Sequence, residues 1–226
     1  QLGEDHPDLA GSYWSIGATW RGKQDLPKAK EFIGKAYAIF LKKLGPDHAH
    51  TKLTRTELDR LAKLSMEFSK AREEFERIRA TAEKGDVEAQ YALGTRYRLG
   101  QGVVKDFKEA VKWYRKAAEQ GNANAQSSLG VRYANGEGVP INHLEAFKWY
   151  RKAAEQGHGM AQFNLGGRYS TGRGVEKDQI EAYKWYSLAI DKGYATAKSK
   201  RDSLVKEMTP DQIAKAEEYY EKAYTI

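Results

Sequence analysis

Apolar residues in the central part of the chain recur every three or four positions, and this pattern itself returns every 36 residues. The register is clearest at Trp113, Trp149 and Trp185, and it extends to tyrosine, glycine and alanine positions. A spacing of three and four places apolar side chains along one face of a helix. A helix pair with such a face buries it only by stacking on a neighbouring pair, so a fixed period of this length is typical of repeat proteins. The pattern therefore predicts an all-α chain with three 36-residue repeats over residues 85–193.

Each predicted repeat consists of two antiparallel helices joined by a glycine-rich connection. In the first repeat, Ala89, Leu93 and Tyr97 share one face of the first helix, which ends at Gly100 and Gly102. Glycine suits these positions because it adopts backbone conformations that other residues avoid. The second helix of each repeat begins after a predicted N-cap residue, namely Asp106, Asn142 or Asp178. A glutamate follows three residues later, the spacing of a capping box, in which both side chains bond exposed amides of the first turn.

The segment AQYALGTRYRLGQGVVKDFKEAVKWYRKAAEQG and its two successors resemble the Sel1-like repeat (SLR) family. This family is a relative of the tetratricopeptide repeat (TPR) with a longer connection between its helices. The resemblance covers residues 85–193. It implies a right-handed α-solenoid, that is, a superhelix of stacked antiparallel helix pairs of the TPR/SLR type. It further implies that the chain serves as a scaffold or adaptor for other proteins.

A second period, of 42 residues, is found upstream of these repeats. The sequence LGEDH at residues 2–6 returns as LGPDH at residues 44–48, and the residues between them include the large and small packing positions of a TPR. This segment resembles the TPR of kinesin light chains. We therefore expect residues 1–84 to form two TPR-like repeats, the first truncated upstream and the second degenerate.

The degenerate repeat leaves two interpretations of residues 57–84. Met66 replaces the turn glycine of the TPR pattern, so this segment is either a helix pair with a turn near residues 65–67 or one long helix. We favour the helix pair, because the TPR phase continues directly into Gly85.

The chain after Gly193 is expected to cap the array. The repeat pattern decays there, while helix-like apolar spacing continues. Thr209, Pro210 and Gln212 stand at the N-cap, first and third positions of a predicted last helix. We therefore expect residues 194–226 to form C-terminal capping helices.

The composition excludes several classes of protein. The chain has no cysteine, so disulfides, thiolate metal sites and cysteine nucleophiles are excluded. No stretch approaches 18 consecutive apolar residues, so no transmembrane helix is predicted. The first residue is Gln1, from which we expect the chain to be part of a longer protein. These observations leave the compartment open between a bacterial periplasm and cytoplasm.

No motif predicts catalysis, and we expect neither enzyme activity nor a bound cofactor. The serines and lysines lack the partner spacing that activates a nucleophile. The glycine-rich stretch LGQGVV follows a predicted helix instead of a strand and lacks the lysine of a phosphate-binding loop. His48 and His50 have the spacing of a chelating pair, but no third ligand stands nearby in the pattern, so no metal site is predicted.

The candidate site is the concave face of the solenoid, which the first helix of each pair lines in TPR-like proteins. Core positions repeat because the packing repeats, so positions that vary between repeats are available to bind a partner. Tyr91 and Phe163 are expected to be exposed aromatic anchors for a protein or peptide. The other candidate binding residues at variable positions are Thr95, Arg98, Ser127, Val131 and Asn164. Further variable positions include Met160, Gly167 and Ser170 of the third repeat.

Arg96, Arg132 and Arg168 share one position of the repeat. Stacking would place them in a ladder at intervals of roughly 10 Å. Such a ladder suits an acidic partner, because arginine binds carboxylates through forked hydrogen bonds. Alternatively, each arginine pairs with a carboxylate or a helix carbonyl of the neighbouring repeat. We favour this structural role, since a residue that is constant among repeats usually serves the packing.

Nucleic-acid binding is the alternative function. The net charge is +7, from 38 Lys and Arg against 31 Asp and Glu, and the chain has 14 tyrosines. Helical repeats are able to read RNA one base per repeat. However, most of the tyrosines occupy framework positions, and acidic residues interleave with the basic ones. We therefore expect a protein or peptide partner, and RNA only as the alternative.

Overall fold

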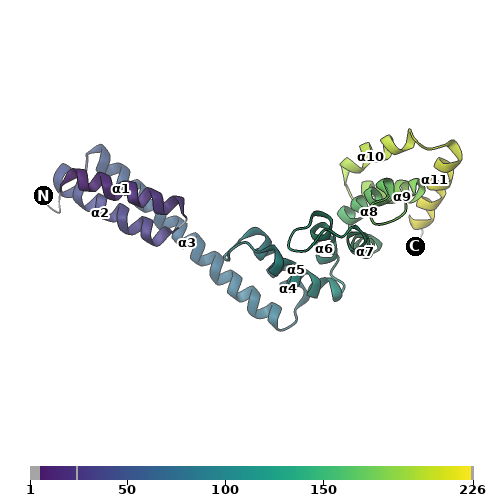
Figure 1. Cartoon of the computed structure of the whole chain (residues 1–226), viewed down its shortest axis with the longest axis horizontal. Helices are drawn as coiled ribbons and strands as arrows, with labels where there is room; N and C mark the ends of the chain where they lie inside the picture. The colour runs from purple at the N-terminus through teal and green to yellow at the C-terminus, as the bar shows by residue number, and fades with distance from the viewer. Residues whose placement is uncertain (1–5, 24, 225–226) are drawn as a thin grey trace. The chain divides into compact units, whose positions relative to one another are not determined.

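The computed structural model describes residues 6–23 and 25–224, which form helices and contain no strand (Figure 1). The all-α prediction is therefore confirmed. The chain divides into two compact units, one up to Glu74 and one from Phe75 onward.

The first unit contains the helix pair α1 (Pro7–Gly22) and α2 (Leu26–Leu44) and the start of α3 (Ala49–Glu83). An ideal Cβ atom on Gly17 of α1 would lie 2.5 Å from Cγ1 of Ile33, so only glycine allows α2 to approach this closely. Ile33 shares a buried core with Leu61 of α3. Arg21 of α1 donates a hydrogen bond to Glu57 of α3 at 2.6 Å. These contacts hold the three helices of the first unit together.

Helix α3 is continuous over 35 residues. The predicted turn near residues 65–67 is therefore wrong. The segment from Ala49 to Glu83 contains neither glycine nor proline, so no residue interrupts its ladder of backbone hydrogen bonds. The apolar spacing continues instead through Leu64 and Phe68, which are exposed. The assignment of residues 1–84 to TPR repeats stays a prediction.

The second unit contains three helix pairs in which every helix spans 13 residues. The pairs are α4 (Val87–Leu99) with α5 (Phe107–Glu119), α6 (Ala123–Asn135) with α7 (His143–Glu155), and α8 (Gly159–Thr171) with α9 (Gln179–Asp191). An ideal Cβ on Gly94 of α4 would lie 2.7 Å from Cδ1 of Tyr114 in α5. The equivalent glycines of α6 and α8 meet Tyr150 and Tyr186 in the same way. A glycine opposite a tyrosine ring therefore sets the spacing of each pair.

The predicted N-caps of α5, α7 and α9 are confirmed, but the capping box is only half formed. Asp106 Oδ1 accepts from the amides of Lys108 at 2.8 Å and Glu109 at 3.1 Å. The Glu109 carboxylate accepts from Lys112 instead of reaching back to the N-cap. The amide of Asp106 is already engaged, because it donates to the carbonyl of Tyr97 at 2.9 Å. The next two repeats show the same arrangement.

Glycines of the connections also determine how the repeats stack. Gly138 passes so close to α5 that a Cβ atom would overlap the carbonyl oxygen of Phe107, and Gly174 approaches His143 of α7 in the same way. Both glycines have positive φ, 78° and 83°. The conformation and the lack of room each require glycine. These residues therefore belong to the interface between repeats as well as to the turn.

Buried glutamines add hydrogen bonds between the repeats. Gln126 of α6 donates from Nε2 to the carbonyl of Ala118 in α5 at 3.1 Å and accepts from Gln156 at 2.7 Å. Gln90 of α4 donates to the carbonyl of Ala82 in α3 at 3.3 Å. A buried amide needs such partners because leaving it unpaired is costly. The end of α3 therefore accepts a glutamine hydrogen bond from α4 in the same way that α5 accepts one from α6.

An aromatic contact supports this role of α3. The rings of Phe75 in α3 and Tyr97 in α4 meet edge to face, with centroids 5.4 Å apart and an interplanar angle of 87°. Phe147 of α7 and Tyr169 of α8 meet at the same distance and angle. The last turns of α3 thus provide the second-helix surface on which the first repeat packs.

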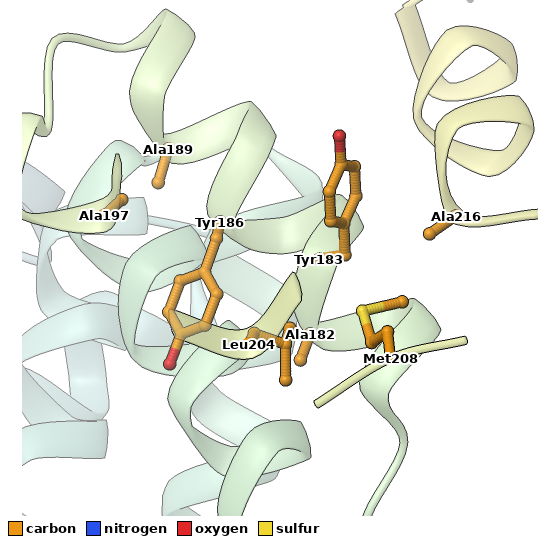
Figure 2. Close-up of a cluster of buried hydrophobic side chains, with 8 residues drawn as sticks. All are labelled: Ala182, Tyr183, Tyr186, Ala189, Ala197, Leu204, Met208 and Ala216. Atoms are coloured by element: carbon orange, nitrogen blue, oxygen red, sulfur yellow. The ribbon is translucent and has the colours of Figure 1, made fainter. Parts of the chain in front are cut away.

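Two further helices, α10 (Ala195–Val205) and α11 (Pro210–Tyr224), pack against α9. Figure 2 shows the buried cluster that they share, with Tyr183 and Tyr186 from α9, Leu204 from α10 and Ala216 from α11. Helix α11 begins at the predicted N-cap, Thr209. Its Oγ1 accepts from the amide of Gln212 at 3.3 Å, and Gln212 Oε1 accepts from the amide of Thr209 at 2.9 Å. This capping box is complete, unlike those of α5, α7 and α9.

Candidate partner-binding surface

Tyr91 of α4 and Phe163 of α8 are half-buried, not fully exposed as predicted. Each packs on the buried tyrosine of its own repeat. The ring centroids are 5.8 Å apart for Tyr91 and Tyr114 and 5.9 Å apart for Phe163 and Tyr186. Part of each ring therefore belongs to the core, and only the rest is open to a partner.

Ser127, the equivalent residue of α6, is only 2% exposed. The prediction that Ser127 lines the surface is therefore wrong. In the first and third repeats this position faces the tyrosine of the second helix, and its aromatic ring is only half-buried, whereas the short serine of the second repeat is covered. Among the described residues, the Ser127 hydroxyl has no hydrogen-bond partner.

In the first repeat, two of the predicted residues cover the hydroxyl of Tyr114. Thr95 Oγ1 lies 3.2 Å from Tyr114 Oη, and Arg98 donates from Nε to the same oxygen at 3.2 Å. In the second repeat, Val131 replaces Thr95 and packs against the core. The hydroxyl of Tyr114 is therefore covered in the first repeat, and the equivalent of Thr95 in the second repeat belongs partly to the core.

None of the three arginines shared by the repeats is fully exposed. Arg96 and Arg168 are half-buried, and Arg132 is buried. Arg132 is 9% exposed, and its Nη1 lies 2.7 Å from Glu137 Oε2 in the following connection. Its guanidinium lies 5.5 Å from the ring centroid of Phe107 in the preceding repeat. The favoured structural role therefore fits Arg132, although its carboxylate partner comes from its own repeat and not from a neighbour.

The third repeat differs because its surface is hollowed above Tyr186. Gly167 and Ser170 stand where the first repeat has Thr95 and Arg98. They border a hollow of about 300 Å³, which we call the α8 hollow. Its lining residues are Phe163, Asn164, Gly167, Arg168, Ser170, Thr171, Arg173, Tyr186 and Lys200.

The α8 hollow is basic. Arg168 of α8, Arg173 of the α8–α9 connection and Lys200 of α10 all line it, and none of its lining residues, all within the described part of the chain, is acidic. Arg168 donates from Nη1 to Nδ1 of His143 at 3.3 Å, and its guanidinium lies 5.5 Å from the ring centroid of Tyr150. The hollow therefore presents one guanidinium held by neighbours and two exposed cations.

Tyr186 lies beneath the α8 hollow. Burial raises the pKa of Tyr186 above its ordinary value, and a hydrogen bond with Ser170 opposes this shift. An ideal Cβ on Gly167 would lie 3.6 Å from Tyr186 Oη, an ordinary contact distance, whereas one on Gly166 would lie 2.8 Å from the ring. Glycine is thus required by packing at residue 166 but not at residue 167. The effect of Gly167 is to leave the hollow open.

Reasoning from the sequence singled out five residues of the α8 hollow, all on α8, but missed Arg173 and Lys200. The five are Phe163, Asn164, Gly167, Arg168 and Ser170. Lys200 reaches the hollow because α10 packs on α9, and the 36-residue pattern decays in α10, where Ala197 keeps the register but a lysine at residue 200 is not predicted by it. The available signal was Gly167, which replaces larger residues of the two earlier repeats.

The buried tyrosines argue against nucleic-acid binding. Tyr114, Tyr150 and Tyr186 are at most 4% exposed, so their rings are not available to stack on bases. Within the residues that the structure describes, no three His, Asp or Glu side chains are grouped as a metal would need. None of the described helices combines the length and apolar character needed to cross a membrane.

The repeats match a known family. The Sel1 repeat model matches residues 87–122, 123–158, 159–194 and 206–225, more than half of the chain. A crystal structure of a Sel1 repeat protein from Oxalobacter formigenes is similar, with 39% identity and a TM-score of 0.54 over 57% of this chain and 98% of that one. The protein c5321, a protective antigen of uropathogenic Escherichia coli with an SLR fold, shares the fold at 23% identity and a TM-score of 0.51, over 95% of this chain and 60% of that one. No curated protein matches the chain in sequence. The Sel1 repeat matches show that the chain belongs to the Sel1 repeat family.

Proposed function

We propose that this chain is a protein-interaction scaffold that holds a peptide or protein partner on the surface of α4, α6 and α8. Sel1 repeat proteins are generally scaffolds for protein interactions, and the match and the fold neighbours point to a non-catalytic role. The observation that carries the proposal is a contrast between two sets of positions. The core residues return in every repeat. In contrast, the side chains of the first helices that are not part of the core differ from repeat to repeat.

Helix α8 offers the best-developed part of this surface. Met160 is 42% exposed at its start, and half-buried Phe163 follows one turn later beside the α8 hollow. Apolar anchors next to polar groups are typical of sites where a few residues supply most of the binding free energy. A peptide that contacts Met160 and Phe163 would reach the cations of the hollow at the same time.

The test compares two apolar-to-arginine substitutions at exposed positions. Peptides that bind the protein are selected from a random library displayed on phage, and their affinities are measured with synthetic peptides. Met160→Arg, on first helix α8, is expected to weaken binding about tenfold by removing an anchor. Leu144→Arg, on second helix α7, is the control and is expected to change affinity less than about twofold.

Both side chains are exposed, Met160 at 42% and Leu144 at 52%, so neither variant is expected to lower the melting temperature. Equal effects of the two substitutions on binding would contradict the assignment of the surface. Failure to select any binding peptide would contradict the peptide-scaffold function itself.

A further inference from the structure

We propose that the α8 hollow binds the side-chain carboxylate of an aspartate or glutamate in the partner peptide. This inference rests on the proposed scaffold function and specifies the chemistry of its partner. The recognised segment of the partner would contain an acidic residue with an apolar neighbour. Phe163 would contact this apolar neighbour.

The first argument is charge. Arg168, Arg173 and Lys200 line the hollow from a helix, a connection and a second helix, without an acidic residue among the lining. Within residues 6–23 and 25–224, no carboxylate forms an ion pair with Arg173 or Lys200. Their positive charge is therefore not neutralised by this chain. A carboxylate of the partner would supply the missing negative charge and accept forked hydrogen bonds from a guanidinium.

The second argument is preorganisation. Arg168 donates to His143 and lies over the ring of Tyr150, so its guanidinium is already held in place before a partner arrives. An arginine that is fixed in advance loses little side-chain entropy on binding. Asn164, Ser170 and Thr171 add uncharged polar groups to the same hollow.

The third argument is the comparison between repeats. In the first repeat, Thr95 and Arg98 lie against the hydroxyl of Tyr114 and leave no such opening. In the third repeat, Gly167 has no side chain, and Ser170, which hydrogen-bonds Tyr186, is much shorter than Arg98, so a hollow remains beside them. Gly167 costs helix propensity, and packing does not require it. The room that Gly167 leaves is therefore available to a bound group.

Two variants test separately how the charge of the hollow and its open space contribute to peptide binding. Arg173→Gln/Lys200→Gln removes two exposed cations. Gly167→Thr introduces the residue of the first repeat and takes up space in the hollow without changing the charge; its Cβ atom would lie at an ordinary contact distance, 3.6 Å, from Tyr186 Oη. Lys108→Gln/Lys112→Gln removes two exposed cations from α5 and is the charge-matched control.

The probe is a library of random peptides displayed through their C-terminal ends, so that every carboxylate in a random segment is a side chain. A second library displays peptides with free C-termini. With the unmodified protein, we expect the first library to yield peptides that share an aspartate or glutamate. Amidated synthetic copies should bind about tenfold more weakly when that residue is replaced by its amide, and also more weakly at high salt.

Both hollow variants are expected to lower the affinity for these amidated peptides about tenfold, and the control less than twofold. None of the variants should melt at a lower temperature than the unmodified protein, and Gly167→Thr should melt at the same temperature or slightly higher. Selected peptides without a shared acidic residue, or equal binding by Gly167→Thr, would overturn the inference. Binding only by peptides with free C-termini would also overturn it, because the carboxylate would then be terminal.

These outcomes are distinct from failure of the scaffold proposal. Peptides that depend on Met160 but show no acidic preference leave the scaffold function standing and remove the carboxylate site. The absence of any binding peptide removes both.

Discussion

Glycines with positive φ occupy two different environments in this chain. Gly121 follows the C-cap residue of α5 with φ 94°, and a Cβ atom there would meet nothing within 4 Å. Gly174 has φ 83°, and a Cβ atom there would overlap the backbone carbonyl of His143. The first glycine is needed only for its conformation, whereas the second is also needed for the stacking of the second and third repeats.

Alanine substitution distinguishes these two requirements. Gly121→Ala is expected to cost about 1 kcal/mol, the penalty of a left-handed conformation for a residue with a side chain. Gly174→Ala is expected to cost about 3 kcal/mol or more, because the overlap with a backbone atom adds to that penalty. The free energies of unfolding are measured in urea. Equal losses in the two variants would show that Gly174 has no role in stacking.

The N-cap of α8 is sensitive to pH. His158 stands where the two earlier repeats have Asp86 and Asn122, and its Nδ1 accepts from the amide of Ala161 at 3.2 Å. Burial lowers the pKa of His158 below its ordinary value. Only the neutral ring accepts at Nδ1, and a positive charge at a helix N-terminus is unfavourable.

Stability is therefore expected to fall on acidification. When the pH drops below the ordinary histidine pKa of about 6.5, the unfolded chain binds a proton at His158 before the folded chain does, so the contribution is full above this value and is lost toward the lowered folded pKa. The melting temperature should fall between about pH 7.5 and pH 5.5, and His158→Asn should reduce this fall. An identical fall in His158→Asn would assign the pH dependence to other groups.

At the scale of elements, α3 shows how local sequence overrides an apparent repeat phase. The TPR phase favoured a turn near residues 65–67, but the segment has no residue that breaks a helix. The physical reason is that a helix ends in a turn only where a residue such as glycine stabilises the turn, whatever the register of the repeat. Met66 stands at the turn position and is 60% exposed.

Substitution of Met66 tests the continuity of α3. Met66→Gly is expected to lower the stability of the helix by about 1 kcal/mol, whereas Met66→Ala should leave it unchanged or slightly higher. The readouts are helicity by circular dichroism and the melting temperature. Cα chemical shifts of residues 65–67 in the unmodified protein should be those of a helix. Non-helical shifts, or an increase in stability with glycine, would restore the turn.

At the scale of the whole molecule, each repeat of the second unit depends on its neighbours. Helix α11 closes the cluster next to α9 through Ala216, which is fully buried (Figure 2). In a stacked array, the loss of one contact surface is felt mainly by the adjacent elements. Disturbing α11 should therefore affect α9 and α10 much more than α4 and α5.

Hydrogen exchange measures how far such a disturbance spreads. Ala216→Arg is expected to displace α11 and to accelerate amide exchange in α9 and α10, with little change in α4 and α5. Ala214→Arg places the same side chain at an exposed position of α11 and should have little effect. Uniform acceleration throughout the second unit by Ala216→Arg would show that it unfolds as one body.

The sequence by itself determined the helix pairs of the second unit. Its apolar period, its N-caps such as Asp106 and its helix-ending glycines act over a few residues of the chain, so they can be read without coordinates. The same local reasoning placed Phe163 and Arg168 on α8. It failed at Ser127, because burial depends on the length of a side chain relative to what lies opposite.

Only the tertiary structure decided which surface features come together. The α8 hollow needs Lys200 of α10 beside Arg173, and the role of Gly174 depends on the carbonyl of a residue in the preceding repeat. Contacts of this kind join residues that are far apart in sequence and follow from the packing of whole helices. A 36-residue period specifies what is alike among repeats. The open hollow arises where the third repeat differs from the other two and where α10, in which the pattern decays, contributes Lys200.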